Sequence, residues 1–477
     1  MEESIWLWLY TALSLFLVLL AFKFLSAKKS KLPPSPVPAL PFIGHLHLLK
    51  QPMHRTFHHL SEKLGPIFSL RFGNRLLVVV SSSTAAEECF TKNDIVLANR
   101  PRFLIGKYIG YNYTTLVGSS YGEHWRNLRR FSAVEIFSSS RLNIFLSMRQ
   151  DEIRRQLQKL YKKSHNHYAT VELKSMLSEL SFNIIMRMVA GKRYFGEDDD
   201  NDEGKHFREL IDEAFALGGA SNPGDFLPLL KWIDYKGIQK NLARVGGKMD
   251  SFLQGLIDER RLKKSENTMI DHLLSLQDSQ PEYYTDTIIK GLINVMLNAG
   301  TDTSSVTIEW ALSVLLNHPE KLERAKDEID RLVGNDHCSQ QHHYSCHMKH
   351  QITVKLGDYD IPRGTILIVN AWAIHRDPTV WDDPTSFKPE RFEVGEVGPS
   401  KLMPFGMGRR SCPGAGLAQR VVGLTLGSLI QCFEWQRINE EKIDLKEGNG
   451  LTMPKAVPLE ASCKARNVLH KVLAGVA

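Results

Sequence analysis

The chain has 477 residues, 43% of them hydrophobic, which is enough for a large core and excludes intrinsic disorder, a collagen-like chain and a small disulfide scaffold. Its net charge of +7 suits a protein that lies beside anionic lipid or binds an acidic partner, and we expect no nucleic-acid partner. The cysteines lack framework spacing, which favours a reducing compartment; they are Cys89, Cys338, Cys346, Cys412, Cys432 and Cys463.

The first predicted element is a transmembrane anchor over residues 1–27. From Ile5 to Leu25 the sequence is almost wholly apolar, a length that can cross a bilayer as a helix. Lys28, Lys29 and Lys31 follow, so the positive-inside rule places the rest of the chain in the cytosol. The alternative is a cleaved secretory signal, but the apolar run exceeds a usual signal core and no small-residue cleavage site follows it.

A proline-rich hinge over residues 28–44 and a single domain over 45–477 are predicted next. The prolines of the hinge forbid a helix and stiffen the chain. In the domain, residues 66–82 alternate about Gly73-Asn74, which predicts a hairpin, and most of 120–335 has helical periodicity. The acidic run 197–203 is predicted to be a solvated loop, and a second β-rich patch spans 359–365. The fold class is therefore mainly α with a small β region.

Two helical segments place polar groups four residues apart. Trp125 and Arg129 lie on one helix face, which by itself would indicate only an exposed helix with a basic side. The apolar stretch from about Asp286 to Asn317 is predicted to form one long helix. In its middle, the Thr303 hydroxyl can bond the carbonyl of Ala299, which would loosen the helix locally.

The strongest signal is the segment Phe405 to Gly414, FGMGRRSCPG. Gly406 and Gly408 permit a tight loop, and Pro413 suits the first turn of the following helix. Cys412, which directly precedes Pro413, would then lie at a helix N-terminus, where the helix dipole favours the thiolate. A thiolate at that position can bind iron, whereas the alternative is a buried structural cysteine in a glycine turn.

This segment resembles the haem-binding signature of the cytochrome P450 superfamily, matched by Phe405, Gly408, Arg410 and Cys412. The segments AWAIHRDP and FKPERF, at residues 371–378 and 387–392, extend the resemblance over nearly the whole chain. The sequences of these segments are similar to those of plant cytochrome P450 family 81, which includes isoflavone hydroxylases. The resemblance implies a cytochrome P450 fold behind an N-terminal transmembrane helix, at the endoplasmic reticulum membrane.

The resemblance also implies roles for particular residues around haem b, whose iron would be bound by the Cys412 thiolate. Arg410, Trp125 and Arg129 would hold the haem propionates. Ala299 and Gly300 would belong to the oxygen-binding groove, with Gly300 removing a side chain where dioxygen must fit. Asp302 and Thr303 would relay protons to dioxygen. The positions expected to contact the cofactor are Cys412, Trp125, Arg129, Arg410, Phe405, Gly406, Ala299 and Gly300.

The implied activity is monooxygenation of an apolar aromatic secondary metabolite, phenolic or isoflavonoid-like. Dioxygen and electrons from NADPH, delivered by a flavoprotein reductase, would be consumed. The substrate pocket is expected to be formed by the 100–118 loop and by the helix near Asn298. Basic residues near the cysteine, such as Lys401 and Arg409, are expected to face the acidic reductase.

One segment departs from the family pattern. Members carry a helix with a Glu-x-x-Arg pair between the oxygen-binding helix and the second β patch, and no such pair occurs in residues 336–351. Arg391 is therefore predicted to have lost its partner, which for a buried charge network costs on the order of 3–5 kcal/mol. We expect the domain to be damaged around 336–355, and a non-catalytic isoform with impaired haem binding is the competing hypothesis.

A shifted reading frame could have produced this interval. When possible codons for His342 to Ile352 are translated in the shifted frame, they can encode a segment like that of family members. An altered splice or gene model is the hypothesis that follows. A zinc site is a further alternative, since thiolates and imidazoles are the usual ligands of zinc. Its spacing fits no standard zinc finger, and its ligands would come from His337, Cys338, His342, His343, Cys346, His347 and His350.

Overall fold

A computed structural model of the chain describes residues 31–196, 202–219, 222–263, 268–333, 348–349, 354–393 and 397–474, together with residues 6, 8, 10, 11, 14 and 15. Among these residues, none of the helices combines the length and the apolar character that a membrane crossing requires. Most of the predicted anchor, residues 1–27, lies outside the described part of the chain.

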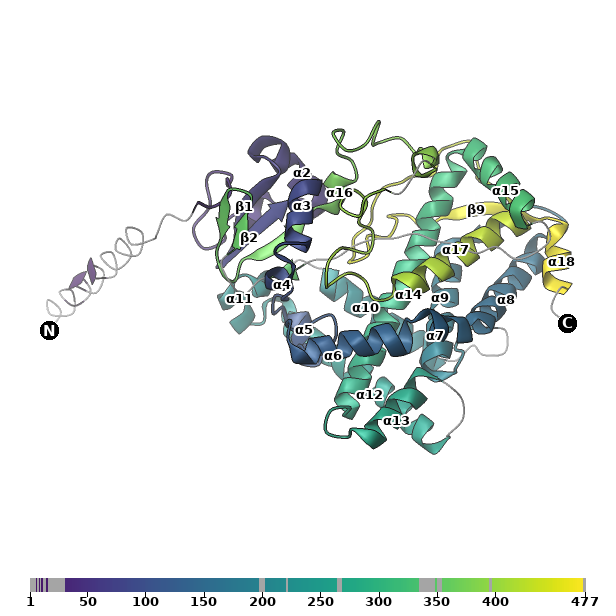
Figure 1. Cartoon of the computed structure of the whole chain (residues 1–477), viewed down its shortest axis with the longest axis horizontal. Coiled ribbons are helices and arrows are strands. Elements are labelled where there is room, and N and C mark those ends of the chain that lie inside the picture. Colours follow the sequence, from purple (N-terminus) through teal and green to yellow (C-terminus); the bar gives the residue numbers. More distant parts are fainter. Residues whose placement is uncertain are drawn as a thin grey trace.

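Helices dominate the structure, as the sequence pattern predicts (Figure 1). They are α2 (Met53–Leu64), α3 (Ser83–Phe90), α4 (Asp94–Leu97), α5 (Leu104–Tyr108), α6 (Glu123–Phe131), α7 (Ser139–Ile144), α8 (Leu146–Ser164), α9 (Leu173–Ala190), α10 (Asp202–Gly219), α11 (Pro228–Trp232), α12 (Ile238–Leu262), α13 (Met269–Ser279), α14 (Asp286–Leu316), α15 (Pro319–Val333), α16 (Ala371–Ile374), α17 (Ala415–Cys432) and α18 (Val468–Ala474).

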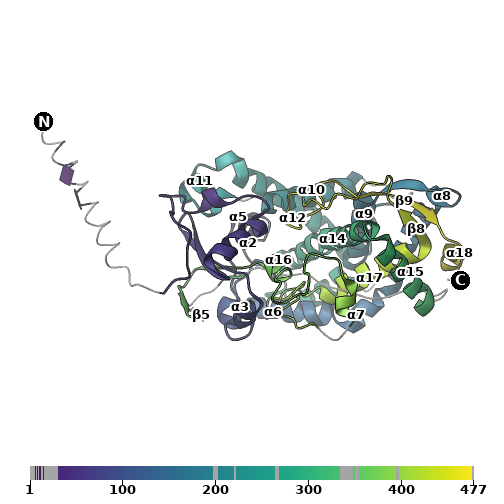
Figure 2. The same ribbon diagram turned by 90° about the horizontal axis from the view of Figure 1, so that it is seen from above.

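The strands form small sheets at opposite ends of the helical body (Figures 1 and 2). One sheet has the order β1-β2-β7-β4, another has the order β3-β9-β8, and β5 pairs with β6. Their bounds are β1 (Ile67–Phe72), β2 (Arg75–Val80), β3 (Ala169–Glu172), β4 (Met348–Lys349), β5 (Val354–Leu356), β6 (Tyr359–Ile361), β7 (Ile366–Val369), β8 (Phe433–Gln436) and β9 (Glu460–Ala465).

The predicted hairpin is confirmed, with β1 and β2 antiparallel and Phe72 opposite Arg75. Gly73 in its turn has φ +56, and a Cβ there would lie 2.2 Å from the carbonyl oxygen of Phe226, so only glycine fits. The proline-rich segment before the hairpin is attached to the sheet, since the amide of Ser69 donates to the carbonyl of Pro34 at 2.7 Å. Of the acidic run 197–203, residues 202 and 203 open α10 rather than a loop, and the others lie outside the described residues.

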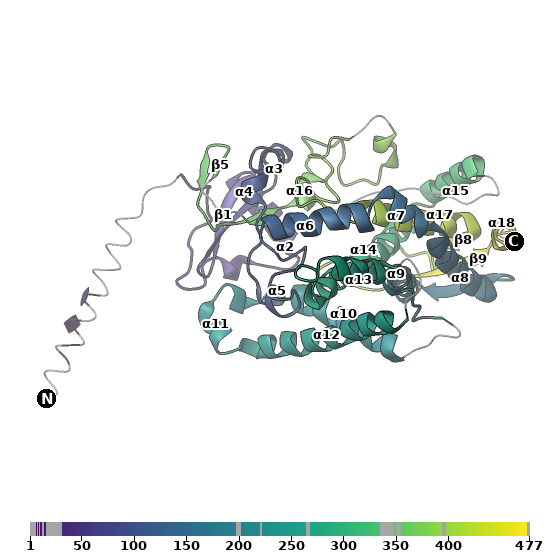
Figure 3. The ribbon, with the colours of Figure 1, turned by 60° about the horizontal axis from the view of Figure 1, so that its bottom comes forward.

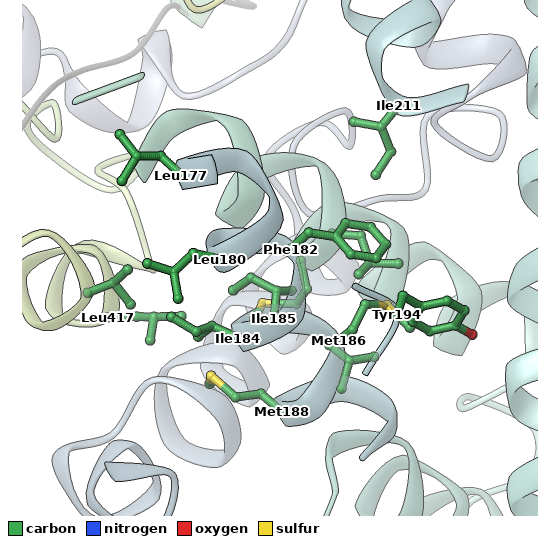
Figure 4. Packing of buried hydrophobic residues seen from close by; sticks show 14 of the residues in the cluster. Leu177, Leu180, Phe182, Ile184, Ile185, Met186, Met188, Tyr194, Ile211 and Leu417 are labelled. Carbon is green, nitrogen blue, oxygen red and sulfur yellow. The ribbon is translucent and has the colours of Figure 1, made fainter. Parts of the chain in front are cut away.

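The core is centred on α9, whose side chains are buried on nearly all sides. Figure 4 shows these side chains packed between Leu417 of α17 and Ile211 of α10. The long helix α14 packs against both α9 and α17, and α10 lies beside α12 (Figure 3). An apolar helix surrounded by others is buried on every face, which explains why α9 lacks a polar stripe.

Candidate functional site

Cys412 lies in the loop that leads into α17. Its amide donates to the carbonyl of Phe405 at 2.7 Å, which closes the loop, and Gly406 and Gly408 supply φ values of +72 and +66. Helix α17 begins at Ala415 with Gly414 as its N-cap. The prediction that Pro413 occupies the first turn is therefore wrong by two positions, because a tight turn precedes the helix. Cys412 still lies just before a helix N-terminus.

Burial distinguishes Cys412 from the other cysteines of the described residues. Cys89, Cys432 and Cys463 are buried, whereas Cys412 is half-buried. Burial raises the pKa of Cys463 to about 11 and that of Cys432 to about 12, so these two remain thiols at neutral pH. Since the thiolate is the form that binds metal, Cys412 is the cysteine placed to act as a ligand.

The loop is held in place by Asp94, at the start of α4. Its carboxylate accepts the amide of Arg409 at 3.0 Å and pairs with the Arg409 Nε at 3.1 Å. Burial raises the pKa of Asp94, although its bonds to Arg409 oppose the shift. A Cβ at Gly408 would lie 2.5 Å from the same carboxylate. The side chain of Arg409 remains exposed on the surface while it makes this pair.

Trp125 and Arg129 of α6 meet the cysteine loop, so the alternative of an exposed basic helix face is excluded. Trp125 is 5% exposed, and its indole lies under the guanidinium of Arg410 at 4.3 Å. Arg129 donates from Nη1 to the carbonyl of Ser411 at 2.7 Å. The structure thus brings two guanidinium groups and one indole together beside Cys412.

Arg410 is itself 5% exposed and is fixed by the main chain. It donates to the carbonyls of Ala98 at 2.6 Å and of Ser119 at 2.7 Å. A third bond, at 3.3 Å, reaches the carbonyl of Leu116, which also accepts the Trp125 indole. A guanidinium has five N–H donors in a rigid fork, so this bonding fixes the group and orients its charge.

The middle of α14 has the predicted hydroxyl-to-carbonyl bond, from Thr303 Oγ1 to the carbonyl of Ala299 at 2.6 Å. The helix nevertheless continues without a break, so the predicted loosening is not seen. Ala299 and Thr303 are exposed, whereas Leu297, Thr301 and Ser304 are buried. The helix therefore presents an accessible face in the middle of a largely buried element.

Gly300 does not have the predicted role. A Cβ at this position would lie 2.6 Å from Cδ1 and 3.0 Å from Cγ1 of Ile185, on α9. The glycine lets α9 and α14 approach closely, because a side chain at this position would point into the contact between the two helices. Room beside Ala299 and Thr303 comes from the accessible face of the helix, not from Gly300.

Two residues near Asp302, Thr452 and Asp212, carried no sequence signal. The hydroxyl of Thr452 donates to the carboxylate of Asp302, 150 residues earlier in the chain. Asp212 of α10 lies near the same carboxylate, and burial, with added repulsion from Asp302, raises the pKa of Asp212. His375, which belongs to the AWAIHRDP segment at residues 371–378, accepts a hydrogen bond from the amide of Met403 at 3.1 Å, and this contact anchors the start of the cysteine loop.

The prediction that Arg391 lacks a partner is wrong. It is half-buried and donates to the carbonyls of Lys388, Asp383 and Ser386 at 3.1–3.2 Å. Its guanidinium also lies 5.7 Å from the ring of Trp381. Because main-chain carbonyls satisfy the donors, the cost expected for an isolated buried charge does not apply.

The acidic neighbour of Arg391 has partners on another helix. Glu390 pairs with Lys321 and with Arg324, at 3.0 Å for the latter, and both cations belong to α15. This pair of contacts ties the PERF segment to the helix that follows α14. Surface pairs of this kind contribute little stability individually.

The interval 336–355 is described only at residues 348–349 and 354–355. The residues of the zinc alternative lie outside the described part. In the remainder that the structure describes, no three histidine, cysteine or acidic side chains gather as a metal site. The zinc alternative therefore stays untested.

Comparison with known proteins identifies the family. The cytochrome P450 family model matches residues 33–349 and 346–459, two segments that meet inside the divergent interval. Cytochrome P450 81Q32 of Catharanthus roseus is 60% identical over 495 aligned residues, covering 99% of each chain. Because that alignment is longer than the 477-residue chain, part of the relative has no counterpart here.

Two further relatives carry functional names. The (+)-piperitol/(+)-sesamin synthase CYP81Q2 of Sesamum radiatum is 53% identical, with 98% of each chain covered. The isoflavone 2'-hydroxylase of Glycyrrhiza echinata is also 53% identical, over 96% of this chain and 98% of its own. The chain therefore belongs to the cytochrome P450 monooxygenase family, and it is similar to plant members of family 81.

Proposed function

We propose that the chain binds haem b through the Cys412 thiolate and hydroxylates an apolar aromatic metabolite of the phenolic or isoflavonoid class. The observation that carries this proposal is the convergence of Trp125, Arg129 and Arg410 on the loop of Cys412. The names of the relatives, an isoflavone 2'-hydroxylase and a (+)-piperitol/(+)-sesamin synthase, support an aromatic substrate.

The residues present fit a haem. A half-buried cysteine before a helix N-terminus can supply a thiolate, and the two guanidinium groups beside it suit the carboxylates of the cofactor. Trp125, Arg129 and Arg410 would hold the propionates. When bound, the haem activates dioxygen, with electron donation from the thiolate favouring O–O cleavage.

The side chains of α14 would manage protons and substrate. Thr303 has its hydroxyl on the accessible face of the helix and would place the proton that Asp302 supplies. Thr452 would orient the Asp302 carboxylate through its hydroxyl bond. The substrate would lie between this face and the 100–118 loop.

The electrons would come from NADPH through a flavoprotein reductase, which is the partner we propose. The apolar segment 5–25 supports an anchor in the endoplasmic reticulum membrane, with the catalytic domain in the cytosol. Lys401 and Arg409 are surface cations near the cysteine loop that suit an acidic partner.

A second candidate is a non-catalytic, membrane-anchored isoform with impaired haem binding. It is favoured by the family match, which splits in two inside the interval 336–355, and by cytochrome P450 81Q32, part of which has no counterpart in this chain. An altered splice or gene model would account for the interval. Transcript sequencing across residues 334–357 distinguishes a real isoform from an artefact.

Haem incorporation by the full-length chain tests the proposal. We expect the reduced chain with carbon monoxide to show the red-shifted band of a thiolate haem. Cys412→Ala should abolish this band, whereas Cys432→Ala, which removes a thiol from the end of α17, should retain it. A Cys412→Ala variant that keeps the band would show that the ligand is assigned wrongly. A chain that gains the band only when the relatives' segment is restored would favour the second candidate.

A further inference from the structure

Four polar side chains follow one another along the first half of α14 at four-residue spacing: Lys290, Asn294, Asn298 and Asp302. Residues spaced by four lie on adjacent turns of the same helix face. The first of them, Lys290, pairs with Asp250 of α12 at 2.6 Å, and the hydroxyl of Tyr111 donates to the same carboxylate at 3.0 Å. A polar row thus runs along a helix that is otherwise mainly apolar.

The two asparagines of this row form a directed chain of hydrogen bonds. Asn294, 5% exposed, donates from Nδ2 to the carbonyl of Ile109 at 2.9 Å. Its own Oδ1 accepts Asn298 Nδ2 at 2.6 Å, and its main-chain carbonyl accepts the same nitrogen at 2.8 Å. A carbonyl acceptor at each step requires a nitrogen donor, so the network fixes the orientation of both amides.

In this arrangement the amide nitrogen of Asn298 is used as a donor to Asn294, and only the amide oxygen is left for another partner. The nitrogen has two hydrogens and lies within hydrogen-bond distance of two oxygen atoms of Asn294, the main-chain carbonyl oxygen and Oδ1. Rotation of the amide would place its oxygen against two other oxygens, which is unfavourable. The Asn298 side chain therefore presents Oδ1 as a fixed acceptor.

Asn298 is the helix neighbour of the accessible face of α14. Asn298 is half-buried, and the next residue, Ala299, is exposed together with Thr303 one turn further on. Ile109, whose carbonyl accepts the Asn294 amide, is the C-cap of α5, a short helix that the structure shows inside the predicted 100–118 loop. Residues 111–113 of that loop have φ values of +48, +52 and +65, a left-handed turn that costs energy unless its surroundings hold it. The polar row of α14 supplies part of that support.

We propose that Asn298 Oδ1 accepts a hydrogen bond from a hydroxyl group of the substrate, so that Asn298 selects phenols over their methyl ethers. The proposal rests on the proposed function, because it assigns a specificity-determining residue to the same site. A fixed acceptor cannot bond to a methoxyl oxygen, which has no hydrogen to donate. Asn294 is the positioning residue that keeps the amide in this orientation.

Binding of a matched pair of probes tests this assignment on the full-length chain in detergent. The probes are 7,4′-dihydroxyisoflavone and 7,4′-dimethoxyisoflavone, measured by isothermal titration calorimetry. We expect the dihydroxy compound to bind more tightly, and Asn298→Leu to weaken it about three- to tenfold, the range of one neutral hydrogen bond. The affinity for the dimethoxy compound should change less than about twofold, a shift too small for a lost hydrogen bond.

Two further variants separate recognition from packing. Asn294→Leu keeps the acceptor but frees its orientation, so the preference for the dihydroxy probe should fall by less than with Asn298→Leu. Thr307→Val removes only a local bond to the Thr303 carbonyl and should leave the preference intact. Equal weakening of both probes by Asn298→Leu, an unchanged preference, or binding of neither probe would overturn the proposal. The carbon monoxide band of the same preparations reports separately on the proposed function.

Discussion

His375 is expected to make the stability of the domain depend on pH in the acid range. Its Nε2 accepts the Met403 amide at 3.1 Å, which requires the neutral ring. Burial, with repulsion from Arg376, lowers the pKa of His375 from 6.5 to about 4. Between these two values the unfolded chain carries a proton that the folded chain does not.

The magnitude follows from linkage. Because the folded-state pKa is depressed, the contribution of the neutral ring is fully present above pH 6.5 and is lost as the pH falls to about 4. A difference of about 2.5 pKa units at roughly 1.4 kcal/mol each gives a loss of about 3 kcal/mol over that range. The lost contact holds the start of the loop that carries Cys412.

Urea unfolding of the full-length chain at pH values from 4 to 7.5 measures this effect. His375→Gln keeps an oxygen acceptor for the Met403 amide but does not titrate. As the pH falls, the free energy of unfolding of the unsubstituted chain should therefore drop by about 3 kcal/mol more than that of His375→Gln. His59→Gln, on the exposed side of α2, is the matched control and should behave like the unsubstituted chain. Parallel pH profiles for the unsubstituted chain and His375→Gln would refute the reasoning.

Three other predictions follow from nonlocal contacts. Gly300→Ala should lower the free energy of unfolding by about 1–3 kcal/mol in urea titration, because the added methyl group overpacks the contact with Ile185. Ile185→Ala in the same chain should recover part of this loss. A neutral Gly300→Ala would contradict the helix contact. Thr452→Val should raise severalfold the share of NADPH electrons released as hydrogen peroxide, with Thr452→Ser restoring coupling, and unchanged coupling would exclude an orienting role toward Asp302. Arg391→Ala should cost about 1–2 kcal/mol in urea titration, since its acceptors are carbonyls on a half-exposed segment, and a loss above about 3 kcal/mol would restore the buried-network interpretation.

The sequence by itself determined the features that depend on neighbours in the chain. The hairpin of β1 and β2 follows from alternation around a glycine turn, and the bond from Thr303 to Ala299 follows from helical spacing. The position of Cys412 before a helix also follows from local turn chemistry, to within two residues. Interactions over one to four residues are fixed by backbone geometry, which is why a pattern can predict them.

Tertiary structure alone decided what the same residues contact at long range. The direction of Gly300 toward Ile185, the bond of Thr452 to Asp302 and the anchor of Met403 on His375 join segments 28 to 150 residues apart. A sequence pattern states which residues can bond, but the partner depends on how α9, α14 and the C-terminal segment pack. Arg391 shows the physical reason most clearly: its donors are satisfied by carbonyl oxygens, and every residue has one, so no residue type in the sequence marks which carbonyls will be near.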